Sequence, residues 1–126
     1  MCFVHDNFLF SHAGVTQTWC ENNRIKTHSI EKSVNDLFRA KPNSFKFTMG
    51  KNKSTDGEDV EQSPIWVRPN SLWRDSVEGG FTQIAGHTTQ PKLLINADVI
   101  LIDTLGTSKE YLIYDNGKFS IGKTIR

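Results

Sequence analysis

Short apolar runs separated by polar turns dominate the start of the chain. Residues 2–4 and 8–10 are apolar and flank His5, Asp6 and Asn7, and an Asp-Asn pair tolerates the positive φ of a tight turn. This pattern predicts a β-hairpin. Its second arm has three consecutive apolar residues, which is typical of a strand covered on both faces, so we expect a central strand in a layered α/β arrangement.

Two helices are predicted next. Thr16 is a candidate N-cap of a short helix that ends at residues 22–23, and Ser29 is a candidate N-cap of a longer helix that closes at residues 41–42. The longer helix carries an apolar stripe at helical spacing, formed by Ile30, Val34, Leu37 and Phe38. We expect this stripe to pack on the sheet.

The rest of the chain predicts mainly strands, at residues 64–69, 81–85, 92–95, 98–103, 110–114 and 118–121. Residues 70–75 predict a turn or a single helical turn. The strongest hairpin signal is Asp115-Asn116-Gly117, which joins the last two strands and gives the sheet an antiparallel edge. The predicted fold class is therefore α/β, with mixed β-sheet layers and flanking helices.

One segment, residues 50–63, is almost free of apolar side chains and predicts a polar surface loop. Its acidic residues Asp56, Glu58 and Asp59 are oxygen ligands in principle. They lack the alternating spacing and the glycine of a calcium-binding loop, so we expect them to be solvated.

Length and composition indicate a single domain over residues 1–126, with 37% hydrophobic and 23% charged residues. A formal net charge of +1 and a pI near 7.8 predict no broad basic face, so DNA is not an expected partner. No apolar run approaches the roughly eighteen residues of a spanning helix, and no leader pattern opens the chain. We therefore expect a cytoplasmic protein without a membrane partner.

The two cysteines, Cys2 and Cys20, lie in or beside apolar segments and form no Cys-x-x-Cys pair. Reduced, buried thiols are the expectation. The chain also enters its first strand at once, as though it began in the middle of a fold. A small protein whose first strand simply begins early is the alternative.

Two apolar runs end at a glycine-containing corner that carries a histidine. Residues 8–10 lead to His12 and Gly14, and residues 81–85 lead to Gly86 and His87. Divalent metals accept a neutral imidazole nitrogen, and glycine lets backbone and substrate approach closely. One shared metal ion is one interpretation. The other is that each histidine is a loop residue bonded to backbone, which residue type and spacing favour.

Arg68 ends the apolar run 64–67 and precedes a proline that constrains the next turn. A planar guanidinium in that position is suited to grip a phosphate. A surface salt bridge to a carboxylate is the alternative.

Four motifs occur in order, namely Leu-Phe-Ser-His-Ala-Gly-Val at residues 9–15, Ile-Trp-Val-Arg-Pro at 65–69, Ala-Gly-His-Thr at 85–88 and Ile-Asp-Thr at 102–104. Together they resemble the C-terminal half of the calcineurin-like metallophosphoesterases. The likeness is greatest to the branch of serine/threonine protein phosphatases and diadenosine tetraphosphate hydrolases. It runs from about residue 8 to the last hairpin.

The resemblance implies the C-terminal half of an α/β/β/α sandwich, with a site for two divalent ions, Mn, Fe or Zn, where an activated hydroxide attacks a phosphate ester. It makes His12 and His87 ligands of the same ion and Arg68 a phosphate-binding residue. Four further residues are assigned supporting positions near the site: Gly14, Gly86, Thr88 and Asp103. Phosphoproteins, dinucleoside polyphosphates and small phosphoesters are all implied substrates.

The family's earlier motifs, Gly-Asp-x-His-Gly, Gly-Asp-x-x-Asp-Arg-Gly and Gly-Asn-His-Glu, do not occur in these 126 residues. Two imidazoles without carboxylates bind metal weakly or not at all, so we expect this chain alone to be inactive. Two other hypotheses stay open. One is a non-catalytic binding or self-assembly module, with a homodimer through the sheet edge near residues 2–4. The other is an α/β domain with coincidental motif matches.

Overall fold

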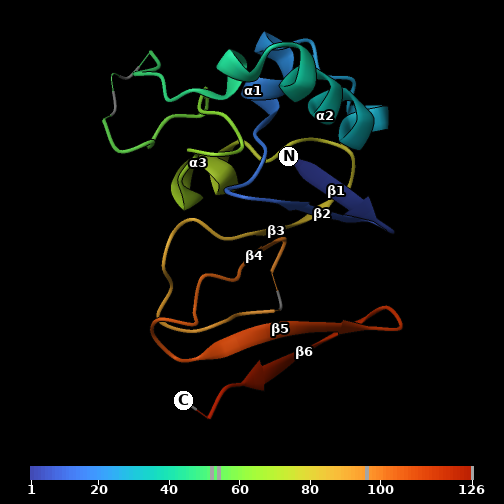
Figure 1. The fold of residues 1–126 in the computed structure, drawn as a ribbon, viewed down its shortest axis with the longest axis vertical. Helices are drawn as coiled ribbons and strands as arrows, with labels where there is room; N and C mark the ends of the chain where they lie inside the picture. The colour runs from blue at the N-terminus through green and yellow to red at the C-terminus, as the bar shows by residue number, and fades with distance from the viewer. Residues whose placement is uncertain (52, 54, 96, 126) are drawn as a thin grey trace.

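The computed structural model of the protein describes residues 1–51, 53, 55–95 and 97–125. The strands of the first sheet are β1 (Cys2–His5), β2 (Phe8–Ser11), β3 (Thr82–Ala85) and β4 (Val99–Leu101), and a second sheet holds β5 (Glu110–Asp115) and β6 (Lys118–Lys123). The helices are α1 (Gln17–Asn22), α2 (Ile30–Ala40) and α3 (Pro69–Arg74), with 3-10 turns at Thr27–Ser29 and Pro42–Phe45. The chain is thus mixed α/β (Figure 1).

The four-stranded sheet has the order β1-β2-β3-β4 and mixes both kinds of pairing. β1 pairs antiparallel with β2 through the predicted two-residue turn, and β2, β3 and β4 run parallel to one another. In register, Ser11 lies beside Ala85 and Ala85 lies beside Leu101. The carboxyl ends of the parallel strands therefore meet along one edge of the sheet.

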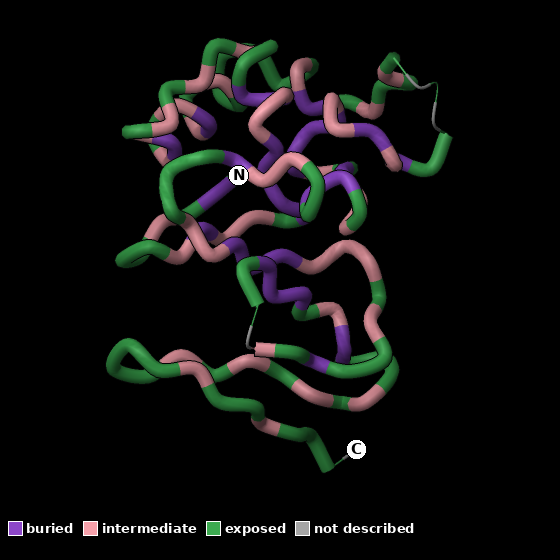
Figure 2. Tube along the Cα trace, turned by 180° about the vertical axis from the view of Figure 1, so that it is seen from behind, coloured by how far each residue is buried: buried purple, intermediate pink, exposed green. Residues whose placement is uncertain are grey.

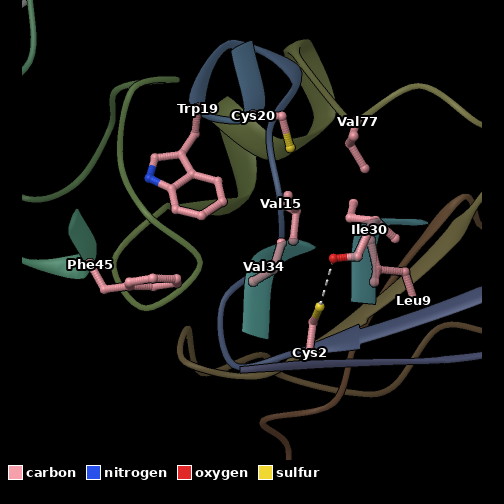
Figure 3. Close-up of a cluster of buried hydrophobic side chains, with 9 residues drawn as sticks. All are labelled: Cys2, Leu9, Val15, Trp19, Cys20, Ile30, Val34, Phe45 and Val77. Carbon is pink, nitrogen blue, oxygen red and sulfur yellow. Dashed lines mark hydrogen bonds between the residues drawn. The ribbon is translucent and has the colours of Figure 1, made fainter. Parts of the chain in front are cut away.

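The helices cover one face of this sheet (Figure 1). Leu9 of β2 points into a buried cluster with Trp19 and Cys20 of α1 and with Ile30 and Val34 of α2. Figure 3 shows this cluster, with the thiol of Cys2 directed at the carbonyl of Ile30. Three residues of the apolar stripe predicted for α2, namely Ile30, Val34 and Leu37, thus pack in this cluster, whereas Phe38 is exposed and lies against Phe45. The predicted N-cap of α2, Ser29, stands at the cap but makes no side-chain capping bond.

Both cysteines are free and buried in this cluster, which confirms the expectation of reduced thiols. Burial raises the pKa of Cys2 to about 11 and that of Cys20 to about 12, because an apolar surrounding disfavours the thiolate.

The β5–β6 hairpin covers the other face of the sheet. Phe8 and Phe10 alternate with Leu9 along β2, so they point to this side, where Phe8 packs against Phe119 with ring centroids 4.6 Å apart. The central position predicted for residues 8–10 is confirmed. Figure 2 shows buried residues gathered between the helices and the sheet, whereas the hairpin alternates intermediate and exposed positions.

The last hairpin was expected to be the edge of the main sheet, and that prediction is wrong. Within the described part of the chain, β5 and β6 pair only with each other, around a turn in which Asn116 and Gly117 both have positive φ. Apolar side chains on one face of the hairpin, including Leu112 and Phe119, attach it to the sheet. Side-chain packing rather than hydrogen bonding therefore joins the two sheets.

Two predicted strands are absent. Residues 64–66 form a turn, residues 67–68 are irregular and Pro69 begins α3, and the amides of Trp66 and Val67 both donate to the carbonyl of Ser63. Residues 92–95 are irregular, and the amide of Leu93 donates to the side chain of Glu110 at 2.8 Å rather than to a strand. In both segments, apolar residues are buried without a neighbouring strand to pair with.

The predicted polar loop is exposed only in its first part, and positions 52 and 54 lie outside the described residues. Asp59 is buried, which corrects the expectation of solvation for this residue, whereas Asp56 is exposed and Glu58 is half-buried. Gln62 is buried too and exchanges hydrogen bonds with the backbone of Thr48, while Ser63 Oγ donates to the carbonyl of Phe45 at 2.8 Å. These polar side chains replace backbone pairing and hold the end of the loop against the domain.

The edge strand β1, expected to be open for dimer formation, has outward backbone groups of Cys2 and Val4 bonded within the chain. Asn35 Oδ1 accepts from the amide of Cys2 at 3.1 Å, and Asn35 Nδ2 donates to its carbonyl at 3.0 Å. Glu31 Oε2 accepts from the amide of Val4 at 2.9 Å. Side chains of α2 therefore stand where a further strand would pair.

Among the residues that the structure describes, no helix combines the length and the apolar character needed to cross a membrane.

Candidate functional site

His12 follows directly on β2, in a loop whose successive backbone amides are all bonded. The amide of Ala13 donates to the carbonyl of Pro64 at 2.8 Å, that of Gly14 to Ser11 Oγ at 3.0 Å and that of Val15 to Gln83 Oε1 at 2.7 Å. Gln83 is fully buried on β3, and its amide group also donates to the carbonyl of Val15. The sheet itself thus holds the loop that carries His12.

Gly14 is required by the shape of this loop. Its φ is +110°, and a Cβ there would lie 2.4 Å from Leu72 Cδ2 of α3. Only glycine combines that backbone conformation with the close approach of α3.

His87 lies one residue beyond the end of β3, the parallel neighbour of β2, after Gly86. The amide of Gly86 donates to the carbonyl of His12 at 2.9 Å, which continues the strand pairing into the two loops. His87 itself has a φ of +68° and is the centre of a three-residue turn, closed by the amide of Thr88 donating to the carbonyl of Gly86 at 2.8 Å. Such turns are strained for a non-glycine residue and cluster at functional sites.

Gly86 has no comparable steric need to be glycine. A Cβ at that position would lie 3.6 Å from the carbonyl oxygen of His12, an ordinary contact. The supporting role predicted for Gly86 is therefore carried by its backbone amide.

The two imidazoles face each other. His12 Nε2 lies 3.0 Å from His87 Nδ1, and the ring centroids are 4.9 Å apart. The other nitrogen of His87, Nε2, is buried and has no hydrogen-bond partner among the described residues. Burial, followed by the charges of Arg68 and His12, lowers the pKa of His87, so the neutral ring is favoured.

Arg68 lies beside the histidine pair. It precedes α3, and its Nη1 donates to Thr88 Oγ1 at 3.1 Å while its Nε donates to the carbonyl of Asp56 at 2.7 Å. Among the described residues, no salt bridge between Arg68 and a carboxylate is found. The salt bridge considered as an alternative for Arg68 is therefore not observed in this part of the chain.

Asp103 lies on the far side of Thr88, just beyond β4. Its Oδ2 accepts a hydrogen bond from Thr89 Oγ1 at 3.2 Å, and its backbone carbonyl accepts from the amide of Gln90 at 2.9 Å. The negative charge of Asp103 acts to raise the pKa of His87, but the lowering by burial, Arg68 and His12 is larger. The structure thus brings Asp103 into the neighbourhood of the pair without direct contact with either ring.

Trp66 and Gln83 belong to this region but were not predicted as site residues. The ring of Trp66 lies edge-on to His87 with centroids 6.0 Å apart, and Gln83 holds the His12 loop. Two prolines bracket Trp66 at residues 64 and 69, a signal against the strand that was predicted there. No comparable local signal marks a buried glutamine.

The two facing nitrogens are the atoms with which the histidine pair could hold a metal ion. Tetrahedral zinc with bonds of about 2.1 Å places two ligand nitrogens about 3.4 Å apart, and the 3.0 Å between the facing nitrogens is the distance of a hydrogen bond between the two rings. Within residues 1–51, 53, 55–95 and 97–125, no three His, Cys, Asp or Glu side chains gather closely enough to hold a metal. Among the described residues, the two imidazoles thus face each other without a third such side chain beside them.

Comparison with known proteins found no match to the chain among protein families, curated proteins or solved structures.

Proposed function

We propose that this chain provides two histidine ligands and the phosphate-binding arginine of a metal-dependent phosphoesterase, as the C-terminal half of its layered domain. The observation that carries the proposal is the 3.0 Å approach of His12 Nε2 to His87 Nδ1 beside Arg68. Neutral imidazole nitrogens are ordinary metal ligands, and a small movement of either ring would bring the pair to a ligand spacing. The strained turn at His87 is a further support, because such strain persists where a side chain must be aimed.

The chemistry of the neighbouring residues agrees with a phosphate ester as substrate. Arg68 uses two of its five N–H donors on Thr88 and Asp56, and the remaining donors form a fork suited to phosphate oxygens. A divalent ion held by His12 and His87 would act as a Lewis acid toward the same oxygens. The layered arrangement, with helices on one face of the sheet and a hairpin on the other, is compatible with half of an α/β/β/α sandwich.

The donor set also limits what this chain does alone. Two imidazoles without a carboxylate bind a divalent ion weakly, and the sequence has no Gly-Asp-x-His-Gly or Gly-Asn-His-Glu motif to complete the site. Catalysis under this proposal requires aspartate and asparagine ligands from another segment. The 126-residue chain by itself is inactive.

Metal titration tests the proposal directly. Isothermal titration of the chain with Zn²⁺ or Mn²⁺ is expected to give one weak site that His12→Ala and His87→Ala each abolish. His28→Ala is the matched control, because His28 is exposed on the 3-10 turn at Thr27–Ser29, outside the site. Binding that survives both site variants would overturn the assignment of the ligands.

A colorimetric phosphomonoesterase assay with added Mn²⁺ tests the second part. The expected result is no turnover by this chain and turnover by any longer version that includes the aspartate-containing motifs. Turnover by the 126-residue chain alone would overturn the claim that it is inactive.

A further inference from the structure

A pocket of about 360 Å³ opens next to the histidine pair and is not used by the proposed metal site. Its lining residues are Phe47, Thr55, Asp56, Trp66 and Arg68. Arg68 and Trp66 link it to the site, because Arg68 also donates to Thr88 and the ring of Trp66 lies 6.0 Å from that of His87. Its volume lies in the usual range of small-molecule sites.

Two aromatic rings form the apolar part of this pocket. Phe47 and Trp66 meet edge to face, with centroids 5.6 Å apart and planes at 80°. Trp66 is 39% exposed, so it leaves ring surface uncovered at the pocket rather than completing the core. Exposed aromatic surface of this kind offers a stacking contact to another flat ring.

The polar part of the pocket is formed by Thr55, Asp56 and Arg68, with one charge of each sign. Arg68 is held from two sides, by its Nε bond to the carbonyl of Asp56 and its Nη1 bond to Thr88, so the guanidinium keeps a defined orientation. The carboxylate of Asp56, which also lines the pocket, accepts a hydrogen bond from the amide of Glu58 at 3.1 Å within its own turn. The guanidinium therefore offers donors to an anionic ligand at the boundary between the pocket and the histidine pair.

We infer that this pocket binds the aromatic group of the phosphoester, with the phosphate on Arg68 and directed toward His12 and His87. The inference rests on the proposed function and narrows its substrate class to phosphate esters of flat rings, such as aryl phosphates and nucleotides. An aliphatic phosphoester uses the arginine alone and leaves the aromatic rings unused.

Metal-free ligand binding tests this inference. The 126-residue chain in EDTA is titrated with phenyl phosphate, adenosine monophosphate and glycerol 3-phosphate, with calorimetry as the readout. Stacking on one aromatic side chain gives about a tenfold gain in affinity, so at least one aromatic ester is expected to bind about tenfold more tightly than glycerol 3-phosphate. Tighter binding of the nucleotide assigns the pocket to a nucleobase, and tighter binding of phenyl phosphate assigns it to a single ring.

Substitutions separate the two parts of the pocket. Trp66→Leu is expected to remove the preference for aromatic esters, Trp66→Phe to keep most of it, and Arg68→Ala to weaken all three ligands. Trp73→Leu is the matched control, because Trp73 is 57% exposed on α3 and lines a different pocket.

Equal affinity for the three esters, or a preference that Trp66→Leu leaves unchanged in a folded variant, would overturn the inference. Because these measurements need neither metal nor turnover, this failure is distinct from that of the proposed function. Loss of metal binding with the aromatic preference intact overturns only the metal site.

Discussion

His12 and His87 stand 75 positions apart in the chain, yet His12 Nε2 lies 3.0 Å from His87 Nδ1. Two parallel strands, β2 and β3, produce this approach, because they end side by side and each places a histidine just beyond its carboxyl end. The loops after the strands remain paired through the bond from the Gly86 amide to the His12 carbonyl. The geometry of the pair is therefore a property of the sheet, and substitutions that disturb the sheet at this edge are expected to disturb the site.

Gly14→Ala tests the close approach of α3 to the His12 loop. An alanine at a φ of +110° is strained, and its Cβ would meet Leu72 at 2.4 Å, so α3 or the loop must move. We expect a loss of about 2–4 kcal/mol in the free energy of unfolding, measured by urea denaturation. Gly106→Ala is the control, because a Cβ there meets nothing within 4 Å. Equal stability of the Gly14 variant and the wild type would contradict the account of this loop.

Gln83→Leu tests the buried amide that holds the same loop. The substitution leaves the buried amide of Val15 without a partner and removes the bond to Ser76 Oγ at 2.8 Å, whereas the carbonyl of Val15 keeps the amide of Val77 as a donor. Unpaired buried polar groups cost about 1–3 kcal/mol each, so a loss of about 2–4 kcal/mol is expected.

The control for this prediction is Gln17→Leu, because the hydrogen bonds of the Gln17 side-chain amide lie at the exposed surface. It should change the free energy of unfolding by less than about 1 kcal/mol. If the two variants were equally stable, Gln83 would not be the residue that holds the loop.

Asn35→Ala tests the covered edge of the sheet. Asn35 bonds both the amide and the carbonyl of Cys2, and the terminal amine of Met1 donates to its Oδ1 at 2.7 Å. We expect a loss of about 1–2 kcal/mol in stability. Because the variant exposes the unpaired edge of β1, it is also expected to associate more than the wild type in size-exclusion chromatography.

Lys32→Ala is the control on the same helix, because its ion pair with Asp36 is exposed. If the wild-type protein already forms a dimer and Asn35→Ala leaves that dimer unchanged, a surface other than the edge of β1 mediates association.

The lowered pKa of Glu110 predicts how the stability of the folded state depends on pH. The amide of Leu93 and then the hydroxyl of Ser108 donate to its carboxylate, which lowers its pKa below the ordinary 4.5. A carboxylate with a lowered pKa in the folded state contributes stability that is fully present above 4.5 and is lost as the pH falls through the lower folded value. In that acidic range, the melting temperature of Glu110→Gln should therefore fall less steeply with decreasing pH than that of the wild type.

Thermal unfolding between pH 7 and pH 2.5 measures this effect. Glu78→Gln is the comparison, because Glu78 is exposed and its carboxylate accepts no hydrogen bond among the described residues. If the Glu78 variant and the Glu110 variant followed the same pH profile, the hydrogen bonds to Glu110 would contribute nothing to acid sensitivity.

Elements with a strong local signal were predicted well from the sequence. The turn at Asn116 and Gly117 requires positive φ and lies where the pattern predicts, and Thr16 caps α1 by accepting from the amide of Trp19. The two strands predicted at residues 64–69 and 92–95 failed for the opposite reason. An apolar run indicates that a segment is buried, but the segment forms a β-strand only if it pairs with a neighbouring strand. Neither of these two segments is paired in that way.

What the sequence by itself determined is the local chemistry: two apolar strands that each end at a histidine, an arginine before a proline, and the glycine that the His12 loop requires. These follow from backbone preference and side-chain type within a few residues. Only the tertiary structure decided that β2 and β3 lie side by side in parallel register, that Trp66 and Arg68 border the same site, and that the last hairpin forms a separate layer. Such placements depend on which apolar faces bury one another across long stretches of chain, and local preferences do not determine that choice.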